Sequence, residues 1–420
     1  MPVAVIAGFL LLALKYTGIV KPDARTLEIL VYHCIALGFI AMSLRVSIKD
    51  KKQGVGHVGL KSGAAIVSSY LIQAVTGLII SLGLGFTFMP RLFKAAGILL
   101  PMGYGQGPGQ ANNVGGSYEA LGFSGGRSFG LSLAAAGYLC ACIVGVIMLN
   151  VLVKKGRLNN REHVKKEEDL SVGFFQDKNE IPISDSIDKL SVQIAMVLLV
   201  YLLTFLVTWG LSSGITAISA GLGKTLNPLL WGFNFIIGSA LAMLTKDALE
   251  WFKKKKFMVR QYQNNYLLNR ISGFFFDIMI VAGIASINLE DLSGLWIPFI
   301  LMAVAGGIVT WYWLKVACRK IYPGYYYEGL ISMYGMMTGT IGSGILLLRE
   351  IDPNFDTPAA NNLVSGSSFG IILGIPVLIL VGLAPKSTAL CVVTLGLALL
   401  YWVILYFFVI CKKEKIKAKD

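Results

Sequence analysis

Charged residues are scarce in this sequence. Lys, Arg, Asp and Glu together make up 14% of the 420 residues, whereas hydrophobic residues make up 55%. About a quarter of the residues of an ordinary soluble domain are charged, so the composition excludes that class. Several runs of about 18 or more residues have no interior charge, which is long enough to cross the hydrocarbon core of a bilayer. The sequence therefore predicts an all-α polytopic membrane protein.

Metal-ligand and catalytic motifs are also missing. The three histidines are dispersed, and the six cysteines lie in or beside apolar runs without the spacing of a metal site. Cys140 and Cys142 are two residues apart on an expected helix, so their side chains do not face each other. No GxxxxGK[ST] or HExxH pattern occurs; these patterns indicate nucleotide-driven pumps and metalloproteases. GxSxG does occur, for example at 126–130 and 366–370, but the hydrolase motif needs a strand before its serine, and these matches lie at the openings of expected membrane spans. We expect neither an enzyme nor a resident cofactor.

Ten apolar stretches are expected to cross the membrane, although the first is short for a span and is expected to be truncated or tilted. Threaded alternately, they place 28 of the 37 Lys and Arg residues in loops on one side and eight on the other. The positive-inside rule makes the first side cytoplasmic and puts both termini there, in the cell (inner) membrane. The location of the charges thus attributes the net charge of +14 to cytoplasmic loops beside the lipid bilayer, and we expect no nucleic-acid partner. The stretches lie near residues 2–14, 27–44, 63–83, 128–153, 190–210, 226–245, 271–288, 295–314, 368–384 and 387–410.

A charged segment at residues 154–189 divides the chain and is expected to be a cytoplasmic linker. Residues 1–153 and 190–386 each contain a glycine-rich stretch between spans, and the alternation gives the two halves opposite orientations. Their closing spans open on similar motifs, GRSFG at 126–130 and GSSFG at 366–370. The expected architecture is a pair of inverted-topology repeats.

The two glycine-rich stretches occupy equivalent places in the halves. Residues 103–126 contain nine glycines in 24 positions, and residues 335–344 contain four in ten. Irregular backbone at membrane depth is tolerated only where protein or a wet cavity surrounds it, because unmet N–H and C=O groups in lipid are costly. In inverted repeats such interruptions indicate a transporter's binding site. We expect re-entrant loops at about residues 95–126 and 328–348, with surface loops as the alternative.

The two loops supply neutral oxygen atoms and adaptable backbone. Glycine lets the backbone approach a ligand closely, and helix ends at membrane depth can hold an anion or a sodium ion. The alternative is that the polar side chains satisfy the loop backbone. The residues expected to bind substrate are Gly105, Gln106, Gly107, Gln110, Asn112, Thr338, Gly339, Thr340 and Arg349. Those expected to bind sodium are Asn113, Gly342 and Ser343.

Charged residues near the loops allow two interpretations. Arg349 offers a bidentate fork for a carboxylate, or an internal ion pair with an acidic neighbour. Glu119 and Arg127 are expected to form a solvated pair outside the membrane. Asp277 interrupts an apolar span and is a secondary functional candidate, with a structural role near the cytoplasmic side as the stronger alternative.

The chain resembles the sodium:glutamate symporter family of bacteria from Pro2 to about Pro385. The resemblance is carried by GYGQGPGQANNVGGSYEALGFSGGRSFGLSLAAAGY at 103–138 and TGTIGSGILLLREIDPNFDTPAANN at 338–362. It implies two re-entrant loops that meet near mid-membrane, bind L-glutamate with sodium and operate by alternating access.

The chain departs from the family pattern in three places. The family usually has Gly-Gly-His-Gly-Thr at the heart of the first loop, where this sequence has GYGQG at 103–107. The family generally has a further span before the segment matching residues 2–14, and residues 387–420 add a helix and a basic tail. L-Glutamate is the leading substrate, and another carboxylate or a neutral amino acid is the alternative. A more remote alternative is an ion channel with glycine-rich loops. For the transporter, a homodimer is expected by analogy with other secondary transporters.

Overall fold

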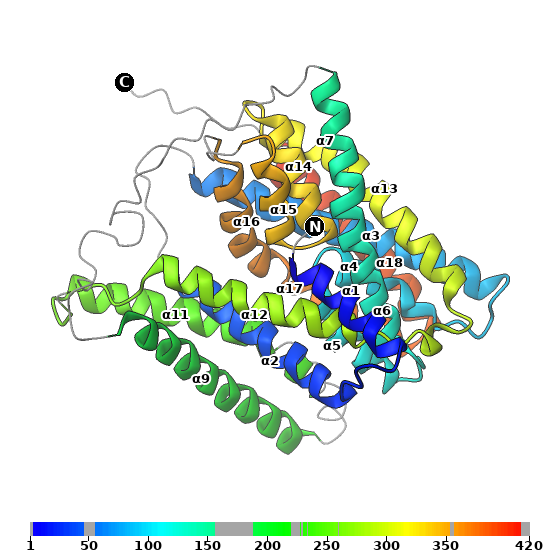
Figure 1. Ribbon diagram of the computed structural model, residues 1–420, viewed down its shortest axis with the longest axis horizontal. Coiled ribbons are helices and arrows are strands. Elements are labelled where there is room, and N and C mark those ends of the chain that lie inside the picture. The colour runs from blue at the N-terminus through cyan, green and yellow to red at the C-terminus, as the bar shows by residue number, and fades with distance from the viewer. Residues whose placement is uncertain are drawn as a thin grey trace. The chain divides into compact units, whose positions relative to one another are not determined.

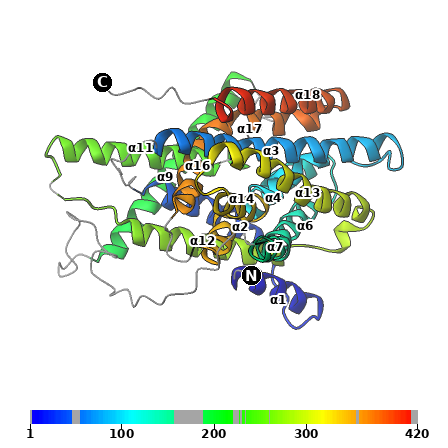
Figure 2. The same ribbon diagram turned by 90° about the horizontal axis from the view of Figure 1, so that it is seen from above.

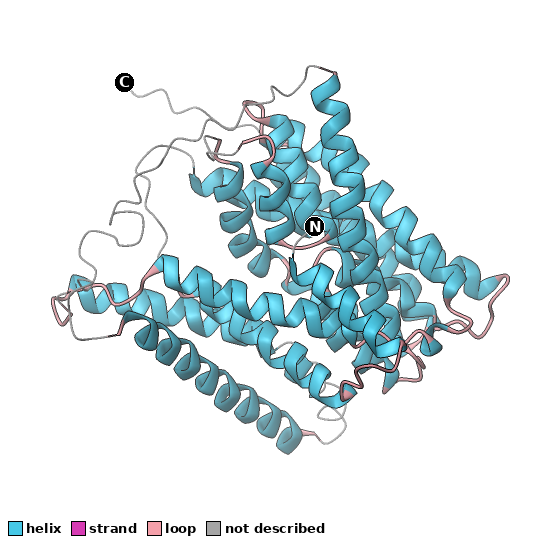
Figure 3. Cartoon of the chain, viewed as in Figure 1, coloured by secondary structure: helices cyan, strands magenta, loops and turns pink. Residues whose placement is uncertain are grey.

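The computed structural model describes residues 3–45, 55–155, 188–219, 227, 230–232, 234–258, 260–352 and 357–412. Its regular structure in these ranges is entirely helical (Figure 3). The expected all-α class is confirmed.

Within the described residues, eight helices are long and apolar enough to cross a membrane, which is the pattern of a multi-pass α-helical membrane protein. They correspond to eight of the ten expected spans. Their bounds are Ala24–Ser43, His57–Phe86, Gly126–Leu152, Lys189–Ile218, Asn265–Ala285, Trp296–Ile321, Phe369–Lys386 and Thr388–Ile410.

The other two expected spans differ from this pattern. Helix α1 (Val3–Tyr16) is apolar but has only 14 residues. The expected span at 226–245 falls partly outside the described residues. Helix α11 (Asn234–Lys254) begins within that span and runs beyond it, and its second half carries the charged residues from Lys246 onward. The helix therefore extends nine residues beyond the expected end of the span, into the basic segment that follows it.

The chain divides into two compact units, each assembled from separate segments. Unit 1 comprises Met1–Ile6, Lys52–His163 and Ile287–Asp420, and unit 2 comprises Ala7–Lys51 and Val164–Ser286. Each unit thus contains segments from both expected halves. The packing units therefore do not coincide with the two halves that the sequence predicts.

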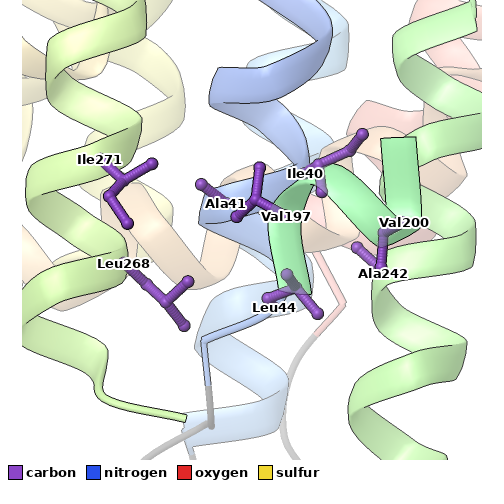
Figure 4. Close-up of a cluster of buried hydrophobic side chains, with 8 residues drawn as sticks. All are labelled: Ile40, Ala41, Leu44, Val197, Val200, Ala242, Leu268 and Ile271. Carbon is purple, nitrogen blue, oxygen red and sulfur yellow. The ribbon is translucent and has the colours of Figure 1, made fainter. Parts of the chain in front are cut away.

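Unit 2 has a core formed by helices that are distant in sequence. Figure 4 shows buried aliphatic side chains from four helices meeting in one cluster, including Ile40, Val197, Ala242 and Leu268. Ser272 Oγ donates to the carbonyl oxygen of Gly38 at 3.0 Å, which joins two of these helices directly. The four helices are α2 (Ala24–Ser43), α9 (Lys189–Ile218), α11 and α12 (Asn265–Ala285).

Unit 1 is built along α3 (Val55–Phe86), a helix of 32 residues. Glycine lets neighbouring segments approach it closely: a Cβ added to Gly77 would lie 2.1 Å from the carbonyl oxygen of Gly97. Figure 2 shows α18 running beside α3, and the two helices are in contact. The long partners of α3 are α13 (Trp296–Ile321), α16 (Ala359–Leu373) and α18 (Thr388–Ile404).

Short helices complete unit 1 (Figure 1). The first group consists of η1 (Lys94–Ile98), α4 (Leu99–Tyr104), α5 (Pro108–Glu119), α6 (Gly126–Leu139), the π-helical η2 (Cys140–Val144) and α7 (Gly145–Lys154). The second consists of η3 (Glu290–Leu292), α14 (Tyr326–Thr338), α15 (Ile341–Arg349), α17 (Ile375–Leu383), η4 (Ala384–Lys386) and the π-helical η5 (Leu405–Ile410).

The expectation of irregular backbone throughout residues 103–126 is wrong for its larger part, because 15 of these 24 positions are helical: two in α4, 12 in α5 and one in α6. Its glycines serve close helix packing instead. A Cβ added to Gly115 would lie 2.6 Å from the carbonyl oxygen of Gly126, and one added to Gly130 would lie 2.8 Å from that of Ala111. Small residues at such an interface let two helix backbones approach.

Candidate functional site

The first glycine-rich stretch contains a short break between α4 and α5. The N–H groups of Gly105 and Gln106 both donate to the carbonyl oxygen of Pro101, at 3.0 and 3.1 Å, which ends α4. Gly107 then has φ +87°, a conformation that glycine adopts without the steric cost that other residues meet. Pro108 follows at the start of α5, where the lack of an N–H leaves no helical bond unmade.

The second glycine-rich stretch is interrupted at Gly339 and Thr340, between α14 and α15. The N–H of Gly339 donates to the carbonyl oxygen of Gly335 at 3.1 Å, and α15 begins with the bond from Gly344 N–H to the Thr340 carbonyl, at 3.0 Å. There is no room for a side chain at Gly339, because an added Cβ would lie 2.8 Å from Ser343 Oγ.

The two breaks lie against each other within unit 1. A Cβ built on Gly107 would be in ordinary contact with Thr340 Cγ2, at 3.8 Å. Helix α6 holds the second break from another side, because a Cβ on Gly137 would lie only 2.3 Å from the carbonyl oxygen of Thr338. Two segments more than 200 residues apart in the sequence therefore form one centre.

Two helix N-termini meet at this contact, since Gly107 caps α5 and Thr340 caps α15. The N–H groups of a first helical turn have no carbonyl one turn back. Neither helix has an acidic residue in its first turn, and neither capping side chain accepts a hydrogen bond from these described turns. Each N-terminus carries about half a positive charge. The centre is thus electropositive without a carboxylate of either first turn to balance it.

Buried acceptor oxygens surround the breaks. Gln110 in the first turn of α5, Asn112 in α5 and Ser343 in the first turn of α15 are at most 4% exposed. Their side-chain oxygens form no hydrogen bond with any described residue. A buried polar atom without a partner is costly, so this arrangement is suited to a ligand that supplies the partners. The described residues contain no cluster of three or more His, Cys, Asp and Glu side chains that could hold a metal.

One residue of this centre, Gln73 of α3, was not predicted from the sequence. Its Nε2 donates to the carbonyl oxygen of Met337 at 2.9 Å and to Thr310 Oγ1 at 2.8 Å. Its Oε1 would lie 3.0 Å from a Cβ on Gly105. Gln73 therefore connects the end of α14 with the break after α4. A polar amide inside an apolar span was the available signal.

The predicted site residues fall into two groups. The structure brings Gly105, Gly107, Thr338, Gly339 and Thr340 together at the breaks, as the previous contacts show. Partly buried Gln106 lies in the first break. Gly342 is the second residue of α15, and a Cβ added to it would lie 3.5 Å from Thr340 Oγ1. Asn113 lies one turn into α5, where its carbonyl accepts from Ser117 Oγ at 2.9 Å.

Arg349 lies apart from the two breaks. It is the last residue of α15 and is exposed. A helix rises about 1.5 Å per residue, which puts Arg349 roughly 12 Å along the axis from Ile341 at the start of the helix. Its role as a carboxylate ligand remains a prediction that this placement does not favour.

The other charged candidates lie elsewhere. Arg127 Nε and Glu119 Oε2 are 3.1 Å apart, with side chains 34% and 33% exposed, so the predicted ion pair is confirmed. The backbone N–H of Arg127 also donates to Glu119 Oε1 at 2.9 Å, which makes this carboxylate a clamp at the start of α6. Asp277 lies in α12 of unit 2 and is exposed there, so it belongs to a different unit from the breaks.

These features define a class: a multi-pass α-helical membrane protein with two interrupted helices that meet at a buried polar centre. Comparison of the chain with protein-family models and with curated proteins finds no match. Any statement about its activity therefore depends on the chemistry of this centre and on the motif resemblance described above.

Proposed function

We propose that the protein is a secondary active transporter that couples symport of L-glutamate, or a similar small organic anion, to sodium by alternating access. In this proposal it acts in the cell membrane with both termini in the cytoplasm, and it performs no covalent chemistry. The two interrupted helices are the re-entrant loops of inverted repeats and enter the membrane from opposite faces. The binding site between them opens to each face in turn.

The observation that carries the proposal is the contact between the N-caps Gly107 and Thr340. The first N–H groups of α5 and α15 have no carbonyl one turn back, and free N–H groups at helix N-termini bind anions, which supports an anion site between the two caps. A carboxylate between the two ends gains both dipoles and satisfies donors that otherwise have no partner. Half-helices arranged in this way are a transporter's means of holding an anionic group at membrane depth.

Sodium has suitable ligands in the same centre. The buried Ser343 Oγ accepts no hydrogen bond from the described residues, and Asn113 and Gly342 lie in the same two helices. Neutral hydroxyl, carboxamide and carbonyl oxygens suit a hard cation. A cation beside the anion also lowers the cost of burying either charge alone, which couples their binding.

The identity of the anion depends on the first break, where GYGQG at residues 103–107 replaces the family's Gly-Gly-His-Gly-Thr. This difference favours testing a second substrate class, another carboxylate or a neutral amino acid. A thermal-shift panel of glutamate, aspartate, glutamine and dicarboxylates, each in sodium and in potassium, separates the two. A sodium-dependent shift with a ligand other than glutamate, and none with glutamate, would assign the other substrate.

The function is tested by uptake of labelled glutamate into proteoliposomes. Accumulation above the external concentration is expected with an inward sodium gradient and not with potassium. Equal uptake in both salts contradicts sodium coupling, and a current that does not saturate with substrate indicates a channel.

A matched pair of variants tests the site itself. Gly107→Ala forces a residue with a Cβ to adopt φ +87°, and Gly294→Ala imposes the same kind of strain at φ +78° in a place with no atom within 4 Å. Each substitution costs about 1–2 kcal/mol. Uptake should be lost in Gly107→Ala and retained in Gly294→Ala. Equal uptake by the two variants would remove the first break from the mechanism.

A further inference from the structure

The carboxamide of Gln73 is a buried group whose two ends have different environments. The side chain is 0% exposed. Its Nε2 has two acceptors, Met337 O and Thr310 Oγ1, whereas its Oε1 has no donor among the described residues. The orientation is determined by chemistry, because only the NH₂ end can donate to a carbonyl. The oxygen is therefore held toward Gly105 in the first break.

A neighbouring group also presents negative partial charge. Gly105 directly follows the C-terminus of α4, and the last carbonyls of a helix have no partner within it and carry its negative end. The amide of Gln73 points its oxygen to this same place. The Pro101 carbonyl already accepts from Gly105 and Gln106, and the Tyr70 ring also lies against Gly105, so the buried Gln73 Oε1 is the oxygen without a donor at this negative helix end.

We infer that Gln73 Oε1 and the carbonyl oxygens at the end of α4 form a binding site for a monovalent alkali cation. Neutral oxygens suit a hard cation, and the nearest described first turns contribute no carboxylate of the kind that a divalent ion would need. The inference rests on the proposed function, because this cation would be the coupling ion. It adds a ligand from α3 that neither glycine-rich stretch contains.

The site also explains how a cation could affect both breaks. A ligand on Oε1 polarises the carboxamide and strengthens the hydrogen bonds that its Nε2 donates, since linked hydrogen bonds reinforce one another. One of those bonds holds the Met337 carbonyl at the end of α14. Occupation of the first break is thereby transmitted to the second through a single side chain.

Cation-dependent thermal stability of the purified full-length protein tests this site without any substrate. Sodium, potassium and lithium chlorides are titrated against choline chloride at constant ionic strength, and the unfolding midpoint is followed by tryptophan fluorescence. The wild type should be stabilised by one of the alkali ions over choline. Gln73→Met keeps the length of the side chain without its oxygen, and the half-stabilising cation concentration should rise about 10-fold to 100-fold.

Gln193 provides the matched control. It is a buried glutamine of α9 whose Oε1 accepts from Asn264 N–H at 3.1 Å and whose Nε2 donates to Tyr262 O at 2.8 Å. Gln193→Met should lower the unfolding midpoint in every salt and leave the half-stabilising concentration unchanged. If Gln73→Met does not fold, Gln73→Glu at alkaline pH decides: the added carboxylate should lower that concentration.

Three outcomes overturn the inference: stabilisation of the wild type that does not distinguish alkali ions from choline, an unchanged half-stabilising concentration in both Gln73 variants, or an equal change in Gln193→Met. The result is separable from the proposed function. If the wild type is stabilised by an alkali cation but shows no sodium-driven uptake, the transport proposal alone is refuted. If it binds the anion but no alkali cation stabilises it, the Gln73 site alone is refuted.

Discussion

Replacing Gly137 by alanine tests whether the second break depends on close support from α6. The added Cβ would lie 2.3 Å from the carbonyl oxygen of Thr338, and contacts of a Cβ shorter than 3.0 Å essentially do not occur, so the two helices have to separate by about 0.7 Å. The obstacle is backbone, which cannot rotate away as a side chain can. Overpacking of this kind costs about 1–3 kcal/mol.

The functional effect should exceed this loss of stability. Thr338 precedes Gly339 in the break, so a shift of its carbonyl moves the N-cap of α15 relative to that of α5. Displacements of about 1 Å at a binding constellation can reduce activity by about a hundredfold. We expect sodium-driven glutamate uptake by Gly137→Ala to fall at least tenfold, that is, by about 1.4 kcal/mol or more, in variants reconstituted at equal amounts.

Gly396→Ala is the control for this measurement. Gly396 lies in α18 of the same unit and has no atom within 4 Å of an added Cβ. Alanine raises helix propensity by up to about 1 kcal/mol there, so the unfolding midpoint should stay or rise and uptake should be unchanged. If Gly137→Ala unfolds and transports like Gly396→Ala, the proposed support of the break by α6 is refuted.

Three further substitutions address the centre and its surroundings. Arg349→Gln should leave the apparent affinity for the carboxylate substrate within about twofold, because a helix of this length separates the side chain from the breaks; a tenfold loss in uptake titrations would restore it as a ligand. Ser343→Ala should change the unfolding midpoint little, since a buried hydroxyl without a partner contributes little stability. It should weaken the apparent sodium affinity of uptake about tenfold; an unchanged sodium dependence would exclude Ser343 Oγ as a sodium ligand. Glu119→Gln should cost less than about 1 kcal/mol in chemical denaturation, because the pair with Arg127 is one-third exposed; a larger loss would show that the clamp at the start of α6 is essential to the fold.

Hydrophobicity and glycine content predicted the helical class, most spans and both breaks. Eight of the expected spans match apolar helices of the structure because the length of an uncharged run reports directly on the bilayer. The positions of Gly107 and Gly339 were also accessible, since a glycine beside proline or threonine in a polar interval is typical of an interruption. The glycine-rich stretches therefore contain both breaks, but composition overestimated the extent of each, because only Gly339 and Thr340 of residues 335–344 lie outside a helix.

The interior partners could not be predicted in the same way. Pro108–Glu119 reads as a polar loop because its glycines lower helix propensity, yet packing on α6 makes the helix stable. Local propensity is overridden by tertiary contact in such cases. Gln73 joins Thr310 and Met337 across 237 and 264 residues of sequence, and a single sequence carries no information on pairs at that separation. Its amide within an apolar run indicates only that some partner exists.

The charge at the centre limits the ligand further. Two helix N-termini contribute roughly one positive charge in total, and the first turns of α5 and α15 contain no acidic residue to neutralise it. One carboxylate group matches that charge, whereas a neutral ligand would leave it uncompensated away from water. The carboxamide of Gln73 contributes an oxygen rather than a charge, so a cation bound there adds to the positive potential until the anion arrives. Under the proposed function, binding of either ion would then favour binding of the other, because each empty half is electrostatically unbalanced, and neutral side chains alone would suffice to couple the two ions.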